Sequence, residues 1–357
     1  MGVKKRSLMK KTLVTGITGQ DGSYLADLLL AKGYDVHGLV RRSSTCNTNR
    51  IDHITDEARK PRAKLTLHYG DLSDSSQLTN LIWSIKPDEI YHMGAQSHVL
   101  VSFDMPEYTS NITAVGTTRI LEAVMRTGAK TRFYQASSGE IFGNAPSPQT
   151  ELTPLAPCSP YAVAKAYAFW MTKCYREAYG LFATNGVLFS HESPRRGELF
   201  VTRKITASVA RIKARKQKYL QMGNIDAERD WGYAPEYVQA IWLMLQQDEP
   251  DDYVLGTGET HSVKEFLAEA FAYVGLDWQE HVKIDPKLFR PRDVETQTAD
   301  ASKAKKKLGW KPTVRFKDIV KIMVDADMEA VGLKAPGEGK KILIKHKLAP
   351  ADRALVH

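Results

Sequence analysis

A glycine-spaced turn near the N-terminus constrains the fold more than any other segment of this chain. Residues 11–22 read KTLVTGITGQDG, in which a short apolar run precedes Gly16, Gly19 and Gly22 and a helical apolar pattern begins at Tyr24. This order predicts a strand, a tight turn and a helix. A turn without side chains lets the backbone approach a pyrophosphate, and the free N–H groups of a helix start favour that anion. The segment therefore predicts a dinucleotide site, with a glycine-rich turn that binds nothing as the alternative.

Strands and helices alternate through the following residues, which favours a parallel sheet with right-handed crossovers. The expected fold class is α/β, a doubly wound Rossmann-type parallel sheet with a smaller mixed α/β substrate lobe. Strands are expected at about residues 12–16, 35–40, 64–70, 88–93, 131–137 and 184–190. Helices are expected at about residues 21–33, 74–85, 106–128 and 160–179 in the first part, and near 201–216, 235–247 and 262–275 in the lobe.

Three regions follow from this pattern. Residues 9–190 are expected to form the dinucleotide-binding domain, and residues 191–334 mainly the smaller substrate lobe, with some segments returning to the first domain. Residues 335–357 combine Gly, Pro and Lys without periodicity and are expected to form a flexible basic tail.

The second expected strand ends in a pair of arginines, Arg41 and Arg42. An enzyme that uses NAD usually places an acidic residue there, against the ribose 2′-hydroxyl. Two guanidinium groups suit a 2′-phosphate instead, which favours NADP, unless the pair is a solvated basic turn. Asp71 follows the third strand and is expected near the adenine or, alternatively, as a cap of the next helix.

Composition and charge limit the kinds of partner and the cellular compartment that suit this chain. The chain has 357 residues, a formal charge of +9 and a pI near 9.2. Its basic residues gather in runs at 203–218, 303–307 and beyond 340, which are interpreted as solvated faces, because no nucleic-acid-binding signature accompanies them. Three scattered cysteines fit neither a disulfide framework nor a metal site and suit a reducing compartment. We expect no metal, no nucleic-acid partner and no membrane partner, and we expect a cytoplasmic location.

A tyrosine and a lysine lie one helical turn apart in the segment SPYAVAK, at Tyr161 and Lys165. Residues four apart share one face of a helix. A tyrosine titrates near pH 10 and is a poor base at neutral pH unless a neighbouring cation favours the phenolate. Lys165 is predicted to be that cation, although the same spacing occurs in ordinary helices.

Ser138 and Glu140 follow the fifth expected strand. On a loop after a strand, both side chains can face one pocket. A carboxylate there can take a proton from a carbon next to a ketone, which a Ser, Tyr and Lys triad alone does not do. The alternatives are a loop-capping serine and a surface acid.

Together these features resemble the extended short-chain dehydrogenase/reductase superfamily, and within it the GDP-mannose 4,6-dehydratase family. The resemblance covers about residues 9–325. It rests on GITGQDGSYL at 16–25, RRSS at 41–44, QSHV at 96–99, HESPRRGE at 191–198, VTRK at 201–204 and RDWG at 229–232.

The resemblance implies a reaction with three steps: oxidation at C4 of the sugar, loss of water across C5 and C6, and hydride return to C6. It implies the catalytic residues Ser138, Glu140, Tyr161 and Lys165. It implies NADP contacts at Gly16, Thr18, Gly19, Gln20, Asp21, Gly22, Arg41, Asp71, Leu72, Met93, Ala95, Ser97, Tyr108, Tyr161, Lys165, His191 and Arg196. Substrate contacts would come from Ser97, Ser138, Glu140, Tyr161, Ser190, Lys204, Arg229, Arg290 and Asp293. A GDP-sugar is the expected partner, and the resemblance implies a dimer or tetramer in which the Arg41–Ser44 loop reaches a neighbouring subunit's cofactor.

The chain departs from the family pattern at several expected pocket positions. Ser138-Gly139 stands where Thr-Ser is common, Ser190 where Asn is, Tyr233 where His is frequent, and Asp293 where Glu is. The smaller Ser190 leaves room for a larger sugar, so a GDP-manno-heptose dehydratase is an alternative. An epimerase or reductase of the superfamily is another, although Glu140 beside Ser138 argues against both.

Overall fold

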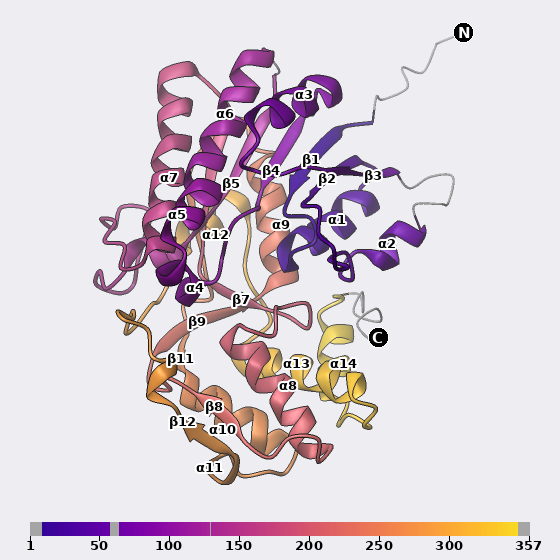
Figure 1. The fold of residues 1–357 in the computed structure, drawn as a ribbon, viewed down its shortest axis with the longest axis vertical. Coiled ribbons are helices and arrows are strands. Elements are labelled where there is room, and N and C mark those ends of the chain that lie inside the picture. Colours follow the sequence, from indigo (N-terminus) through magenta and orange to yellow (C-terminus); the bar gives the residue numbers. More distant parts are fainter. Residues whose placement is uncertain (1–8, 58–63, 129, 349–357) are drawn as a thin grey trace.

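A seven-stranded parallel sheet forms the upper part of the molecule in the computed structural model, which describes residues 9–57, 64–128 and 130–348 (Figure 1). Its strand order is β10-β6-β5-β4-β1-β2-β3, so the order reverses between β1 and β4. Ligands of such sheets bind at the carboxyl ends of the strands beside this reversal. The strands are β1 (Lys11–Thr15), β2 (Asp35–Val40), β3 (Lys64–Tyr69), β4 (Glu89–His92), β5 (Arg132–Ser138), β6 (Ala183–Leu188) and β10 (Tyr253–Leu255). The predicted α/β fold class is confirmed.

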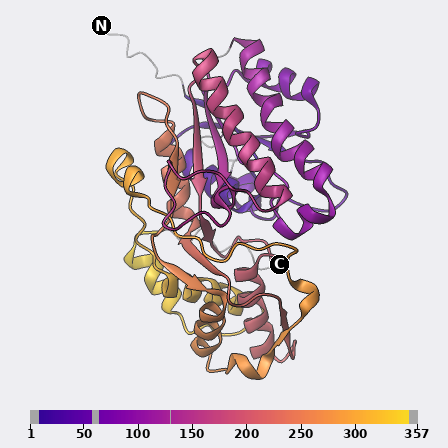
Figure 2. The same ribbon diagram turned by 90° about the vertical axis from the view of Figure 1, so that its left-hand side faces the viewer.

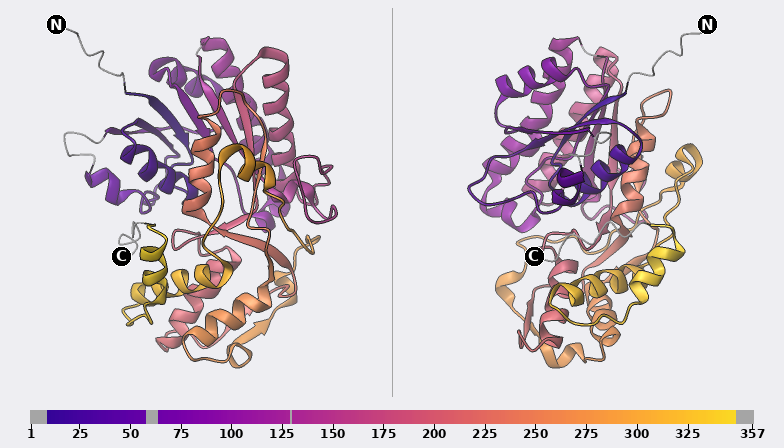
Figure 3. Two further views of the ribbon diagram at one scale, coloured as in Figure 1. Left: turned by 180° about the vertical axis from the view of Figure 1, so that it is seen from behind. Right: turned by 90° about the vertical axis from the view of Figure 1, so that its right-hand side faces the viewer.

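Helices cover both faces of the sheet (Figures 1 and 2). On one face, α3 (Ser75–Ile85), α6 (Gly116–Thr127) and α7 (Pro160–Tyr179) pack side by side and bury an apolar stripe that includes Leu78 and Ile120. The other face is covered by α1 (Gln20–Ala31), α9 (Ala234–Met244) and α12 (Ser302–Leu308), of which Figure 3 shows α9 and α12 from behind. The predicted helix at 106–128 is continuous but irregular: it comprises α5 (Pro106–Thr109), a π-helical segment (Ser110–Val115) and α6. Two short helices, α2 (Asp52–Glu57) and α4 (Val99–Asp104), lie in the loops after β2 and β4.

A smaller lobe lies below the carboxyl ends of the strands (Figure 1). Its core joins Trp231, Phe266 and Phe316, whose rings lie 5.5 to 5.9 Å apart. The lobe contains a three-stranded sheet of β7 (Ser190–Glu192), β9 (Glu228–Tyr233) and β11 (Thr260–Ser262), and a two-stranded sheet of β8 (Leu220–Met222) and β12 (Val282–Ile284). Its helices are α8 (Val201–Lys213), α10 (Val263–Tyr273), α11 (Trp278–His281) and α13 (Phe316–Ala330).

The chain passes between the two parts more than once. After β9 it returns upward to form α9 and β10, and it returns again to form α12. The link between the two parts is therefore built from several chain segments, which restrains their relative position more than a single linker would.

Two expectations about charged segments differ from the structure. The C-terminal segment is not wholly aperiodic, because α14 (Glu338–Lys345) packs on α13 and buries Leu343. The backbone N–H groups of Gly337 and Gly339 donate to the Asp325 carboxylate, which satisfies the start of this short helix. Residues 349–357 lie outside the described part of the chain.

The basic run at 203–218 is not purely a solvated face either. Arg203 is buried, and its Nε donates to both carboxylate oxygens of Asp327 at 2.8 and 2.9 Å. The pairing partner lies 124 residues away, so the charge pattern along α8 gives no sign of it. Among the described residues, none of the helices combines the length and the apolar character that crossing a membrane requires.

Candidate active site

A cavity of about 800 Å³ opens along the carboxyl ends of β1, β2 and β4, at the reversal of strand order. Eleven of the residues predicted to bind the cofactor line it. They are Gly16, Thr18, Gly19, Arg41, Asp71, Leu72, Met93, Ala95, Ser97, Tyr108 and Arg196. Asp71 also accepts hydrogen bonds from the backbone N–H and hydroxyl of Ser73, while Asp74 caps α3, so the capping alternative falls to Asp74.

The glycines of the first turn leave its backbone free of side chains, so that a phosphate can come close to it. Gly16 has a φ of +71°, and a Cβ there would lie 2.9 Å from the backbone nitrogen of Gly94. A Cβ on Gly22 would lie 2.2 Å from the carbonyl oxygen of Gly16. Side chains at either position would push the helix and the loop apart. The cradle therefore fits the pyrophosphate of a dinucleotide against the start of α1.

The two arginines after β2 have different environments. Arg41 lines the cavity, and its guanidinium donates to the Tyr108 hydroxyl at 2.7 Å. The Arg42 guanidinium instead lies over the ring of Tyr69, 5.7 Å from its centroid. Only one arginine of the pair is thus placed to meet a cofactor phosphate.

Gln20, Asp21 and His191 join the start of α1 to the segment after β7. The Gln20 amide donates to the His191 carbonyl at 3.0 Å, and His191 Nε2 lies 2.9 Å from the Asp21 carboxylate. Burial opposes charge on both groups, but their attraction prevails: it lowers the pKa of Asp21 to about 2 and raises the pKa of His191. These three residues hold the cofactor wall together rather than line the cavity.

Arg195 and Arg50 are among the cavity residues that were not predicted from the sequence. Arg195 is 2 % exposed, donates to the Asp27 carboxylate at 2.8 Å and lies over the Tyr24 ring. Arg50 donates to the Arg195 carbonyl at 2.6 Å. The two adjacent arginines in HESPRRGE, Arg195 and Arg196, could have pointed to a cavity residue in this segment, but the sequence alone does not say which of the two is buried.

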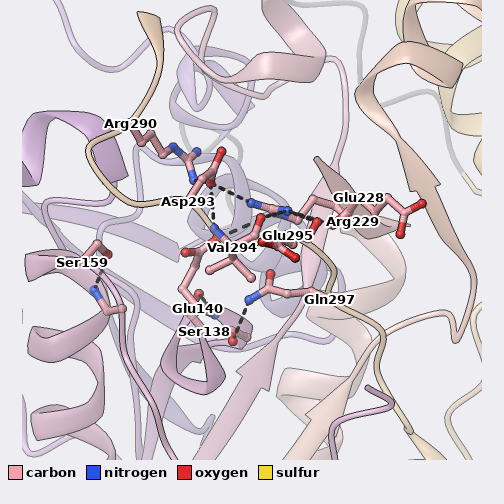
Figure 4. A network of polar contacts seen from close by, with 12 residues as sticks. Ser138, Glu140, Ser159, Glu228, Arg229, Arg290, Asp293, Val294, Glu295 and Gln297 are labelled. Atoms are coloured by element: carbon pink, nitrogen blue, oxygen red, sulfur yellow. Dashed lines mark hydrogen bonds and ion pairs between the residues drawn. The ribbon is translucent and has the colours of Figure 1, made fainter. Parts of the chain in front are cut away.

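Ser138, Tyr161 and Lys165 meet where β5 ends and α7 begins. Ser159 caps α7 by accepting from the Ala162 N–H at 3.1 Å, which sets the first turn that carries Tyr161 (Figure 4). The Tyr161 side chain forms a hydrogen bond with Ser138. Lys165 Nζ donates to the Ala136 carbonyl at 2.6 Å, on the strand that leads to Ser138.

The sequence predicts that Lys165 lowers the pKa of Tyr161, but in the structure the pKa of Tyr161 is raised. Burial raises the pKa of Tyr161 to about 12, and the Ser138 hydrogen bond opposes this only in part. Burial also lowers the pKa of Lys165 to about 8. Nζ lies 5.9 Å from the centre of the Tyr161 ring. Burial thus favours the neutral form of both groups, the phenol of Tyr161 and the amine of Lys165.

Glu140 lies in the turn after β5, near the lobe residues Arg229 and Asp293 (Figure 4). Its carboxylate raises the pKa of Tyr161, so the two groups share one electrostatic environment. On the lobe side, Arg229 Nε lies 4.0 Å from the Glu140 carboxylate. Arg229 is 8 % exposed, and it donates to the Val294 carbonyl at 2.8 Å and to Asp293 at 3.2 Å. Glu140 therefore faces a fixed cation on the lobe side and acts electrostatically on the Tyr161 phenol.

The remaining predicted substrate residues lie on several elements of the lobe and of the cofactor cavity. Arg290 pairs with Asp293 at 3.0 Å, close to Arg229. Lys204 lies on α8 and is half-buried, and burial lowers its pKa while Asp285 opposes that effect. Ser190 begins β7, and Ser97 lies in the cofactor cavity. Within residues 9–57, 64–128 and 130–348, no three His, Cys, Asp or Glu side chains group in a way that could hold a metal ion.

Comparison with solved structures places this fold in a class. The dTDP-glucose 4,6-dehydratase of Streptomyces venezuelae, solved with NAD bound, matches with a TM-score of 0.77 at 24% identity over 91% of this chain and 99% of that one. RMD from Pseudomonas aeruginosa, solved with NADPH, matches with a TM-score of 0.71 at 21% identity over 90% of this chain and 98% of that one. The class is that of α/β folds with a doubly wound parallel sheet and a second, smaller lobe, as the sequence predicts.

Sequence comparison identifies the family. The sequence model of the GDP-mannose 4,6 dehydratase family matches residues 13–323. GDP-mannose 4,6 dehydratase 1 of Arabidopsis thaliana is 58% identical over 325 residues, 90% of each chain. This chain belongs to the GDP-mannose 4,6-dehydratase family, a family of hydro-lyases that act on a nucleotide sugar.

Proposed function

We propose that this protein converts GDP-mannose to GDP-4-keto-6-deoxymannose and uses NADP as its cofactor. The observation that carries the proposal is the place of Glu140, which shares its electrostatic surroundings with Tyr161 and faces Arg229. A dehydrogenase needs the Ser, Tyr and Lys group alone. Water elimination needs a further base one carbon away, and Glu140 is in position to be that base.

Tyr161 is the group assigned to the sugar O4. Its hydroxyl hydrogen-bonds to Ser138, so the two side chains can hold O4 between them. To act as a base, the phenol must lose a proton against the effect of burial, and positive charge near its oxygen favours that loss. Lys165 supplies part of this charge from the next helical turn. A bound oxidised nicotinamide would supply the rest of the charge, accept hydride from C4 and return it to C6.

Glu140 is assigned to C5 and C6. A ketone at C4 acidifies the neighbouring C5–H, and a carboxylate in this position can remove that proton. The same carboxyl group, once protonated, can assist the departure of the C6 hydroxyl as water. Arg229 presents its positive charge to this carboxylate, with Nε 4.0 Å away.

The substrate diphosphate is assigned to the lobe. Lys204 and Arg290 offer cations there, while the outer nitrogens of Arg229 are engaged by Asp293 and backbone carbonyls. Arg229 is therefore assigned mainly to the wall that faces Glu140, and Lys204 and Arg290 to the phosphates.

The position of Arg41 in the cavity supports NADP rather than NAD as the cofactor. The exposed Arg41–Ser44 loop is assigned to a subunit contact near a neighbouring cofactor, in a dimer or tetramer. Residues 9–190 are assigned to NADP and residues 191–334 mainly to the sugar nucleotide, while α14 of the C-terminal segment packs on α13 of the lobe. A cytoplasmic location is proposed on the three free thiols, which suit a reducing compartment.

The test is to incubate the protein with GDP-mannose and a catalytic amount of NADP⁺. The expected product has lost one water from the sugar, with no net formation of NADPH. Net NADPH formation, or a product of unchanged mass, would contradict the proposal and indicate a dehydrogenase or an epimerase. A parallel reaction with GDP-manno-heptose tests the sugar: faster turnover of the heptose would assign the protein to that substrate.

A further inference from the structure

The peptide bond between Gly139 and Glu140 is held at both of its polar ends. Its N–H, which belongs to Glu140, donates to Ser138 Oγ at 3.3 Å. Its carbonyl, which belongs to Gly139, accepts from the side-chain amide of Gln297 at 3.0 Å (Figure 4). A peptide bond is planar, so two hydrogen bonds on opposite edges fix its rotation. The direction in which Glu140 leaves the backbone is thereby set.

Gln297 comes from the far end of the chain, 158 residues from Gly139, and is 2 % exposed. Both of its neighbours in the chain are held by hydrogen bonds. The Thr296 hydroxyl donates to the Glu228 carboxylate at 2.9 Å, and the Thr298 N–H donates to the Gln149 side chain at 3.1 Å. The amide that reaches Gly139 is therefore mounted on a rigid segment, as positioning groups in active sites need to be.

The opposite side of the loop is closed as well. A Cβ on Gly139 would lie 3.2 Å from the ring of Phe189, so the backbone already rests against that ring. Contact with the Phe189 ring prevents the loop from moving in that direction. If the Gly139 carbonyl turned away from Gln297, a buried acceptor would be left unpaired. The same lobe segment carries Asp293, which holds Arg229 against the Glu140 carboxylate. The lobe thus fixes Glu140 twice, at its backbone through Gln297 and at its side chain through Arg229.

We propose that Gln297 is a positioning residue for Glu140: its amide orients the Gly139–Glu140 peptide so that the carboxylate reaches C5 of the sugar. This inference rests on the proposed function, because it gives Gln297 a part in the elimination step. It does not place Gln297 in contact with the substrate or the cofactor. Its loss is therefore expected to slow the step that Glu140 performs and to leave substrate binding intact.

The test is the Gln297→Met variant, which keeps the length and buried volume of the side chain and removes the donor. The informative reaction is the exchange of C5–H of the 4-keto product in D₂O, because this exchange uses Glu140 and requires no hydride transfer. The expected result is a loss of about ten- to hundredfold in C5 exchange and in kcat, as for other small displacements of catalytic groups. The KM for GDP-mannose and the affinity for NADP should stay within about twofold of the unaltered protein.

The matched control is Gln246→Met. Gln246 is a half-buried glutamine whose amide donates to Glu89 at 3.2 Å and to the Trp242 carbonyl at 3.1 Å, and Glu89 begins β4, at the end of the sheet opposite the site. This variant should also lose stability but keep the ratio of C5 exchange to C4 oxidation. Gln297→Asn, which withdraws the amide by one carbon, gives a second test should Gln297→Met fold poorly, and the same selective loss is expected of it.

Amide hydrogen exchange of residues 138–142 provides a readout that is independent of turnover. Exchange of this segment should rise in Gln297→Met and not in Gln246→Met. Unchanged C5 exchange in folded Gln297 variants would overturn the inference, as would an equal loss in the Gln246 control. Failure of the unaltered protein to eliminate water would instead overturn the proposed function, so the two failures are distinguishable.

Discussion

The two walls of the site are held by different means. The wall that carries Ser138, Tyr161 and Lys165 is local: Ser159 caps the helix of Tyr161, and Lys165 reaches a carbonyl only 29 residues away. The lobe wall is assembled over long distances, since Arg229 meets Asp293 across 64 residues and Gln297 meets Gly139 across 158. The assigned chemistry divides in the same way. Oxidation at C4 belongs to the local wall, and elimination across C5 and C6 depends on the assembled one.

Tyr161→Phe tests the local wall and should have the largest effect. Removing the hydroxyl removes the group assigned to the O4 proton, which should lower kcat by about a thousandfold or more. Single-turnover measurements should show no reduced nicotinamide, because the reaction stops before hydride leaves C4. NADP binding, measured by fluorescence titration, should be nearly unchanged. Rapid formation of reduced cofactor in this variant would remove Tyr161 from the first step.

Glu140→Gln tests the junction between the walls. We expect kcat to fall by about a hundred- to a thousandfold, because the base for C5 is lost while the amide keeps the shape of the side chain. In contrast to Tyr161→Phe, this variant should accumulate reduced nicotinamide on the enzyme in a single turnover. If both variants stop at the same stage, the division of labour between the walls is contradicted.

Arg41→Ala tests the cofactor side, with Arg42→Ala as its control. Arg41 lines the cavity, whereas Arg42 lies over Tyr69. A charged hydrogen bond contributes about 1.5–3 kcal/mol, so the KM for NADP should rise about ten- to a hundredfold in the first variant only. The use of NAD should change little in either variant. An equal effect of the two substitutions would indicate that the charge of the turn matters and not the position of Arg41.

Asp21→Asn should have the smallest effect, on stability and its pH dependence. The pKa of Asp21 is lowered from 3.8 to about 2, so its stabilisation is present above about pH 4 and is lost as the pH falls toward 2. The unaltered protein should exceed the variant by about 2 kcal/mol in free energy of unfolding at pH 7. Urea unfolding at pH 7 and pH 3 measures this difference, which should shrink at pH 3. Glu249→Gln, an exposed site, should show no such change.

The sequence predicts one wall better than the other for a physical reason. The glycine turn and the pair Tyr161 and Lys165 depend on spacings of three or four residues, which the local backbone converts directly into geometry. Gln297 carries no local signal, because it matters only through a carbonyl far away in the chain. Arg195 and Arg203 look like surface charges in the sequence, and only the fold shows the carboxylates that permit their burial.

The electrostatics of Tyr161 and Lys165 also lay beyond the sequence. Their spacing predicted a phenol made acidic by a lysine, whereas burial raises the pKa of Tyr161 and lowers that of Lys165. The predicted pairing depends on the balance between desolvation and attraction, and desolvation can be judged only once the packing around both groups is known.

The central claim is that both walls act on neighbouring carbons of one bound sugar. GDP-mannose deuterated at C4 tests this most directly. If the walls act together, the hydride taken from C4 returns within the same site, and the isolated GDP-4-keto-6-deoxymannose carries deuterium at C6. A product without deuterium at C6 would contradict the account.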